Sequence, residues 1–196
     1  MTGHHYSMLY IQAIKFIITH DISALKSFWK TEYLQADNFS WYKIIEKLIK
    51  TKPENFLFLW RLANAMYLSG NKKYVRCAKR LQNRLIIKYN MEIELGAIIG
   101  EGLKIHHYSS IIITKYAVIG KNFTCYQGIT IGWRKEPFKV NIGDNVTIGC
   151  GSTVLGGEIS IGDNVKIGAM SLVTESIPGN CTYVNERIVK IINNTK

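Results

Sequence analysis

The chain has 196 residues, of which 47% are hydrophobic and 20% are charged, and only 3 are prolines. This length and composition predict a folded chain with a core of its own and exclude a disordered or proline-rich linker protein. The 25 basic and 14 acidic residues give a net charge of +11, which favours partners with negative charge, such as nucleic acid, an anionic glycan or a phosphate-rich cosubstrate.

Neither a metal site nor a membrane span is expected. The segment 8–18 is apolar but contains Lys15 and is too short to cross a bilayer, and the first ten residues lack the pattern of a signal peptide. The cysteines form no C-x-x-C pair and are interpreted as small buried residues in a reducing compartment: Cys77, Cys125, Cys150 and Cys181. We therefore expect a cytoplasmic protein without a metal and without an integral membrane segment.

The first 90 residues repeat their apolar side chains at three- and four-residue steps, which is typical of amphipathic helices. Breaks at Lys52-Pro53 and at Ser69-Gly70-Asn71 predict helices over residues 21–50, 54–68 and 72–89 within an α-helical N-terminal region, 1–90. The last of these carries a basic run, for which a solvated helix face is the simpler interpretation and binding of an anionic partner the alternative: Lys72, Lys73, Arg76, Lys79, Arg80, Arg84 and Lys88.

From residue 91 onward the period changes to six. Small aliphatic residues recur at this spacing, often followed by glycine, and the run Ile-Gly-Asp-Asn-Val occurs at both 142–146 and 161–165. Such a repeat predicts a β-helix, in which each side of a coil buries one aliphatic residue and glycine or asparagine permits the corners. We expect this domain over residues 91–178, followed by a C-terminal tail, 179–196.

The repeat is interrupted in three places. Its step is eight residues between Ile111 and Ile119 and seven between Val154 and Ile161, and it is lost over residues 133–141. The last stretch is rich in charge and contains a proline, which predicts a loop that protrudes from the wall of the β-helix. Exposed loops on a rigid scaffold often carry binding residues.

The chain resembles a known enzyme family over roughly residues 57–178, most clearly in the runs IELGAIIGEGLKIHHYSSIIITKYAVIGKNFTCYQGITIG and IGDNVTIGCGSTVLGGEISIGDNVKIGAMSLVTESIP. These runs resemble the serine acetyltransferases and the related O-acetyltransferases that modify bacterial surface polysaccharides. The resemblance implies a mainly β fold, a left-handed parallel β-helix preceded by an α-helical N-terminal region. It also implies a homotrimer that binds acetyl-CoA, the acyl donor, between neighbouring β-helices.

The same resemblance implies a catalytic pair. The family's general base is a histidine whose matching position is His107, and its orienting carboxylate lies 15 residues earlier, at Glu92, with Glu94 as a nearby competitor. The chemistry requires such a base, because a hydroxyl group is a weak nucleophile at neutral pH. A partner on the second ring nitrogen would hold the imidazole in the productive orientation.

The family's acetyl-CoA contacts map onto four positions. They are Gly132, Cys150, Lys166 and Ala169, with Lys166 as a point charge for a CoA phosphate. For Cys150 and Ala169, a structural role as tight corner residues remains the alternative interpretation.

The acceptor site departs from the serine enzymes. These carry an aspartate before the catalytic histidine and an Arg-His pair in the loop, where this chain has His106 and, in the loop, Lys135 and Glu136. Because charge pairing sets acceptor specificity, we expect these residues to bind a sugar hydroxyl of a bacterial surface polysaccharide or its precursor. L-Serine is the alternative acceptor. An alternative of another class is a non-catalytic scaffold that binds an anionic partner; no nucleic-acid motif supports nucleic acid.

Overall fold

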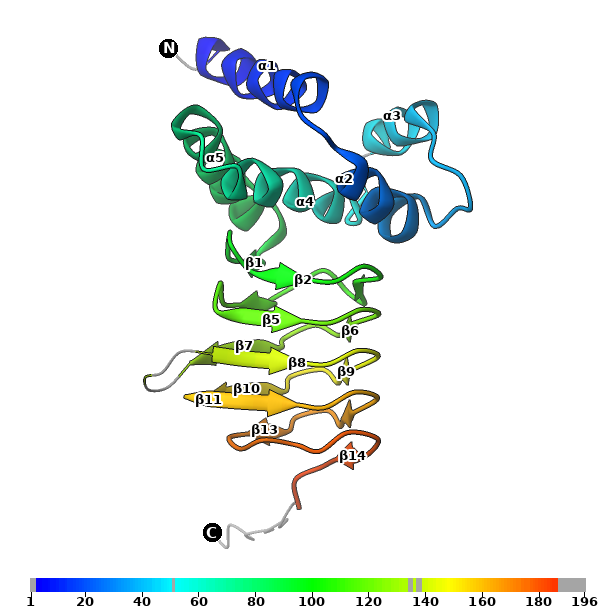
Figure 1. Ribbon diagram of the computed structural model, residues 1–196, viewed down its shortest axis with the longest axis vertical. Helices are drawn as coiled ribbons and strands as arrows, with labels where there is room; N and C mark the ends of the chain where they lie inside the picture. Colours follow the sequence, from blue (N-terminus) through cyan, green and yellow to red (C-terminus); the bar gives the residue numbers. More distant parts are fainter. Residues whose placement is uncertain (1–2, 51, 134–135, 137–138, 187–196) are drawn as a thin grey trace, which may run out of the picture.

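The computed structural model describes residues 3–50, 52–133, 136 and 139–186. Its helices gather at one end of a β-helix, as Figure 1 shows. The predicted fold class, a left-handed parallel β-helix preceded by an α-helical N-terminal region, is confirmed. The helical elements in chain order are α1 (Gly3–Thr19), α2 (Ser23–Phe28), the π-helix η1 (Trp29–Leu34), α3 (Trp41–Ile49), α4 (Asn55–Leu68) and α5 (Lys72–Tyr89).

The single helix predicted over residues 21–50 is wrong, because this stretch forms α2, η1 and α3. Gln35 adopts a left-handed conformation (φ 52°) that ends η1. The Ser40 side chain accepts a hydrogen bond from the Lys43 backbone N–H (3.4 Å) and so marks the start of α3. The predicted helices 54–68 and 72–89 correspond to α4 and α5.

Each coil of the β-helix contributes short strands to three parallel sheets, ordered β1-β4-β7-β10-β13, β2-β5-β8-β11 and β3-β6-β9-β12-β14. The strands are β1 (Glu92–Ile93), β2 (Ile98–Ile99), β3 (Lys104–Ile105), β4 (Ile112–Ile113), β5 (Ala117–Ile119), β6 (Thr124–Cys125), β7 (Thr130–Trp133), β8 (Lys139–Ile142), β9 (Thr147–Ile148), β10 (Thr153–Gly156), β11 (Glu158–Ile161), β12 (Lys166–Ile167), β13 (Leu172–Val173) and β14 (Thr182–Tyr183). Because β14 pairs with β12, the last coil extends past residue 178.

The register of the first sheet shows that one interruption of the six-residue repeat was predicted at the wrong position. Ile93 pairs with Ile113, and Ile113 pairs with Ile131. The buried row therefore runs through Ile113, and the eight-residue step lies between Ile105 and Ile113 rather than between Ile111 and Ile119. Two extra residues thus fall in the corner 106–111, which contains the predicted catalytic histidine.

Asparagines line a different corner of the coils and form an asparagine ladder. Their side-chain amides are linked by hydrogen bonds of 2.8 to 3.0 Å from one coil to the next. All four have positive φ, a conformation that asparagine tolerates better than most residues: Asn122, Asn145, Asn164 and Asn180.

The helices close the open end of the β-helix. Trp60 Nε1 and Gln82 Nε2 donate to the carbonyl oxygen of Ile93 at 2.8 and 2.9 Å. Asn64 Nδ2 donates to the carbonyl oxygen of Ala97 at 3.0 Å. In later coils, carbonyl groups accept from the preceding coil, as Ile119 does from Gly100. Side chains of α4 and α5 therefore supply the donors that a preceding coil would supply.

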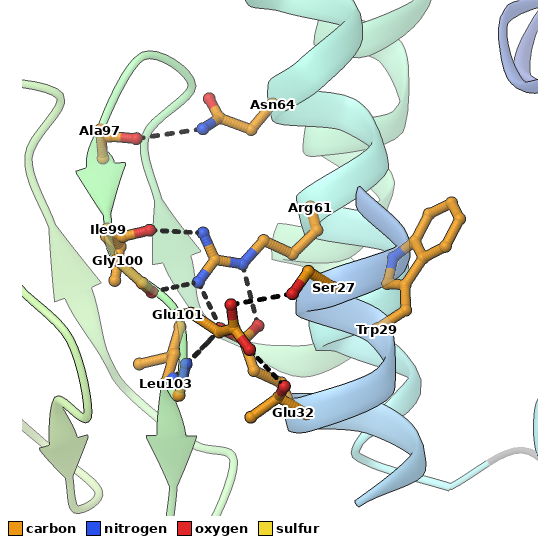
Figure 2. A network of polar contacts seen from close by, with 12 residues as sticks. Ser27, Trp29, Glu32, Arg61, Asn64, Ala97, Ile99, Gly100, Glu101 and Leu103 are labelled. Atoms are coloured by element: carbon orange, nitrogen blue, oxygen red, sulfur yellow. Dashed lines mark hydrogen bonds and ion pairs between the residues drawn. The ribbon is translucent and has the colours of Figure 1, made fainter. Parts of the chain in front are cut away.

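A buried ion pair completes this cap, as Figure 2 shows. Arg61 of α4 donates to the carbonyl oxygens of Ile99 (2.7 Å) and Gly100 (2.8 Å) and also to the carboxylate of Glu32 in η1. That carboxylate accepts, at 3.1 Å each, from two backbone amides of the first coil, Gly102 and Leu103. The helical region and the first coil thus form one continuous packed unit, with a shared hydrophobic core.

Candidate active site

The predicted catalytic histidine lies in the widest corner between the third and first sheets. This corner contains residues 106–111, whereas the corresponding corners of the next coils, 126–129 and 149–152, are two residues shorter. His107 and Ser110 have φ values of 59° and 53°. Left-handed backbone is uncommon outside glycine, and such outliers often mark functional sites.

Among residues 106–110 every side chain except that of Tyr108 is exposed. The side chains of His106 and His107 are exposed, and the His106 ring stacks on Tyr126 of the next coil, with ring centroids 4.6 Å apart. Tyr108 points inward, packs edge-on against Phe56 of α4 and has its pKa raised by burial. Tyr108 therefore anchors the corner to the helical cap while His107 stays accessible to a substrate.

Glu92 is the first residue of β1, and Glu94 directly follows this strand. The Glu94 carboxylate accepts from Thr114 Oγ1 (3.1 Å) and from the Lys115 backbone N–H (2.7 Å), so it is bound to the following corner of the next coil. The backbone N–H of Glu92 donates to the carbonyl oxygen of Ile111 (2.8 Å), the last residue of the histidine corner. Of the two residues, Glu92 is thus the one whose backbone is bonded to this corner.

No hydrogen bond joins Glu92 to His107 among the described residues. The Glu92 side chain is half-buried. Catalytic hydrogen bonds often form only once substrate is bound, so this geometry does not rule the pair out. The orienting role of Glu92 remains a prediction.

Two of the predicted acetyl-CoA residues stack below His107 in the same corner. Cys150 and Ala169 occupy successive coils, where the Met170 backbone N–H donates to the Cys150 carbonyl oxygen (2.8 Å). Three coil steps separate His107 from Ala169, or about 14 Å along the wall. A β-carbon on Gly149 would lie 2.6 Å from the Ala169 backbone nitrogen, so successive coils are closely packed at this corner.

The other two predicted acetyl-CoA residues flank this column. Gly132 lies in β7 and pairs with Leu155 in the first sheet. Lys166 lies in β12 of the third sheet, pairs with Thr147 and has an exposed side chain. A ligand that lay along the corner would contact both sheets, which is compatible with an extended, phosphate-bearing molecule.

The predicted acceptor residues are not brought together within one chain. β7 ends at Trp133, at the opposite end of the first sheet from the corner that contains His106, and the chain enters the second sheet at Lys139 in β8. Glu136, between these two strands, is exposed, and Lys135 lies outside the described residues. A site that used both His106 and Glu136 would therefore need residues from two chains.

Sequence reasoning missed the ring of Tyr126 at this site and the Glu32–Arg61 pair in the cap above it. Tyr126 lies 20 residues after His106, one full coil later, and this spacing becomes visible only once the register is known. The ion pair joins residues 29 positions apart on different helices, and no sequence motif marks it.

The side chain of His107 offers proton transfer at this corner. Burial raises the pKa of Cys125 to about 12, so this thiol is not a nucleophile near neutral pH. The described residues contain no group of three or more His, Cys, Asp or Glu side chains placed to hold a metal ion. An exposed imidazole is suited to removing a proton from a bound hydroxyl group.

Comparisons with known proteins agree on one family. No family model matches the sequence. A serine acetyltransferase of Staphylococcus epidermidis is 42% identical over 130 residues, 64% of this chain and 60% of that protein. A Staphylococcus aureus serine acetyltransferase is 41% identical over 129 residues, again 64% of this chain and 60% of its own length. The match thus spans about 60% of the curated relatives.

Solved structures extend the similarity over the helical region. Neisseria gonorrhoeae serine acetyltransferase in complex with serine has a TM-score of 0.69 and 30% identity, over 91% of this chain and 71% of that one. Serine acetyltransferase isoform 3 of Entamoeba histolytica in complex with cysteine has a TM-score of 0.68 and 27% identity, over 96% of this chain and 66% of that one.

Proposed function

Because the chain belongs to the serine acetyltransferase family of hexapeptide-repeat acyltransferases, we propose that it transfers an acetyl group from acetyl-CoA to a hydroxyl group of a small acceptor, with L-serine the first candidate. The observation that carries this proposal is the placement of His107, exposed on the widened corner whose equivalents in later coils hold Cys150 and Ala169.

In the proposed reaction His107 acts as general base. Its imidazole takes the proton of the acceptor hydroxyl as that oxygen attacks the thioester carbonyl carbon of acetyl-CoA. The tetrahedral intermediate then collapses, the carbon–sulfur bond breaks, and the imidazolium returns the proton to the departing CoA thiolate. Glu92 would orient the ring and stabilise its protonated form. The products are the O-acetylated acceptor and CoA.

Acetyl-CoA would lie along the corner column. The small side chains of Cys150 and Ala169 would let its pantetheine arm approach the wall of the β-helix, and Gly132 would lie beside it on the first sheet. Lys166 would meet a phosphate group as a point charge. These four assignments rest on the family resemblance, and two of the residues, Cys150 and Ala169, also lie in corners equivalent to that of His107.

L-Serine is favoured over a polysaccharide as the acceptor. All of the relatives and neighbours compared above are serine acetyltransferases, and the Neisseria structure contains serine. The sequence-based preference for a sugar used His106, Lys135 and Glu136 as one charge pattern. Since His106 and Glu136 lie at opposite ends of the first sheet, that pattern is not a single site within one chain, and polysaccharide acetylation has no further support.

The family resemblance implies a homotrimer, and we propose this assembly because a site that used both His106 and Glu136 would need residues from two chains. The requirement for acetyl-CoA supports a cytoplasmic location. A non-catalytic scaffold is the remaining alternative, and it predicts that acetyl transfer is absent.

The test is CoA release from acetyl-CoA with and without L-serine, in wild type and a His107→Asn variant. Asparagine tolerates the left-handed backbone at this corner, so the variant keeps the fold but lacks a base. We expect serine-dependent release to fall on the order of a thousandfold. Serine-dependent release that survives His107→Asn contradicts the mechanism. Release that requires oligosaccharides instead of serine contradicts the acceptor, and no release with any acceptor, despite acetyl-CoA binding, contradicts catalysis.

A further inference from the structure

The N-terminal region carries nearly all of the net charge of the chain. Residues 1–90 contain 15 of the 25 basic residues but only 5 of the 14 acidic ones. The β-helix and the residues after it are close to neutral. The candidate active site lies on the β-helix, so acetyl transfer leaves this concentration of positive charge unexplained.

Apolar side chains gather at the same end of the molecule. Helices α1 and α3 border a groove of about 650 Å³ whose floor is formed by α4 and α5. Its walls include Tyr10 and Ile14 of α1 and Trp41 and Ile45 of α3. Tyr10, Ile14 and Ile45 are each more than half exposed. Figure 1 shows both helices at the end of the molecule that is farthest from the β-helix.

The outer face of α3 continues this apolar surface. Tyr42 and Ile49 are 76% and 75% exposed. The exposed side chains of Lys43 and Lys50 lie on the same short helix. On α1, Ile11 and Ile18 are likewise exposed. Aromatic and isoleucine side chains beside lysines are typical of helices that lie in the interface of a membrane.

We propose that α1 and α3 dock this protein onto an anionic lipid bilayer, with their apolar side chains among the lipid headgroups. None of the described helices has the length and hydropathy to span a bilayer, so the contact is peripheral. A second copy of the chain is a poorer occupant, because it would bring together two regions that each carry a large positive charge. Nucleic acid is also a poorer occupant, because it would leave the isoleucines of α1 and α3 without an apolar environment.

The test is vesicle flotation of the full-length protein. Wild type should float with phosphatidylcholine vesicles that contain about one-third phosphatidylglycerol, and not with phosphatidylcholine alone. Raising the salt concentration should weaken binding, because the attraction is screened. A Tyr42→Ser/Ile45→Ser variant should bind at least about tenfold more weakly. The matched control is Leu68→Ser, which removes a side chain 60% exposed at the end of α4, outside the groove.

Two charge-reversal variants test whether the lysines of α3 are needed for binding to the anionic vesicles. Lys43→Glu/Lys50→Glu should abolish flotation, whereas Lys121→Glu on the β-helix should leave it unchanged. Circular dichroism melts confirm that each variant is folded. CoA release in solution is recorded on the same samples, so a failure of docking is separated from a failure of the proposed acetyl transfer.

Three outcomes overturn the proposal. The first is wild-type protein that does not float with the anionic vesicles at low salt. The second is a Tyr42→Ser/Ile45→Ser variant that binds them as wild type does, since the apolar surface would then have no part in docking. The third is a change of oligomeric state in that variant, measured by sedimentation velocity, which would assign the groove to a second copy of the chain.

Discussion

Arg61 of α4 and Glu32 of η1 form an ion pair whose side chains are only 4% and 1% exposed, with Arg61 Nε donating to a Glu32 oxygen at 2.9 Å. Both side chains also bind backbone groups of the first coil, as seen in Figure 2. The pair therefore substitutes for the hydrogen bonds of a preceding coil, and it joins the helical region to the coil that carries Glu92 and His107.

Removing one partner of this pair should strongly destabilise the protein. Arg61→Met leaves a buried carboxylate and two backbone carbonyl groups without their donor, at a cost of about 3–5 kcal/mol. Urea unfolding followed by circular dichroism measures this difference. A loss below about 1 kcal/mol would contradict the proposed cap.

Replacing both partners should not restore stability. Many buried ion pairs can be exchanged for apolar residues at little cost. Here an Arg61→Met/Glu32→Leu variant would still leave the amides of Gly102 and Leu103 and the carbonyl groups above them unpaired. We expect the double variant to be no more stable than Arg61→Met, and recovery to wild-type stability in the same urea titration would contradict this account.

Substitution of Glu92 should lower activity, whereas substitution of Glu94 should lower stability. Glu92→Ala is expected to lower kcat by at least about tenfold, because the imidazolium loses its orienting partner. Glu94→Ala is expected to lower the unfolding free energy by about 1–2 kcal/mol, because two hydrogen bonds to the next corner are lost. Steady-state CoA release and thermal melts of both variants measure the two effects. The reverse assignment, with kcat lost in Glu94→Ala alone, would make Glu94 the orienting residue.

Glu101 should contribute to acid sensitivity. Hydrogen bonds from Thr31 and then Ser27 lower the pKa of its carboxyl group below the ordinary 4.5. The unfolded state then binds the proton more tightly, so this contribution is present above pH 4.5 and is lost as the pH falls through the folded-state pKa. Urea midpoints measured between about pH 5 and pH 3 should fall less steeply in Glu101→Gln than in wild type. Equal slopes would contradict the role of these hydrogen bonds.

The asparagine ladder should be sensitive to its backbone conformation. Asn145 has φ 57° and links Asn122 to Asn164 through its side chain. Asn145→Ala loses both hydrogen bonds and places a β-carbon in a left-handed conformation, at a cost of about 2 kcal/mol in total. Asn145→Gly loses only the hydrogen bonds and should cost about half as much. A glycine variant that is no more stable than the alanine variant, in thermal melts, would contradict the backbone contribution.

The His107 corner shows where sequence reasoning was sufficient and where it was not. The family motif picked out His107, and the structure puts it on an exposed, left-handed corner. The position of the two extra residues was misjudged, because Ile111 and Ile113 are both buried and aliphatic and either continues a six-residue pattern. Only the pairing of Ile113 with Ile93 and Ile131 distinguishes them.

The sequence by itself determined the β-helix, since one buried aliphatic residue per side of each coil is a local repeat that is independent of the rest of the chain. It also determined α4 and α5, whose ends coincide with Pro53, Gly70 and Asn90. The tertiary structure alone decided how the two parts meet. Glu32, Arg61 and the first coil come from separate elements, and their hydrogen bonds depend on distances in space that no periodic pattern encodes. The predicted loop 133–141 is also shorter in the structure, because Trp133 belongs to β7 and residues 139–141 belong to β8. The separation of His106 from Glu136 likewise depends on the fold, since the sequence does not show that they lie at opposite ends of the first sheet.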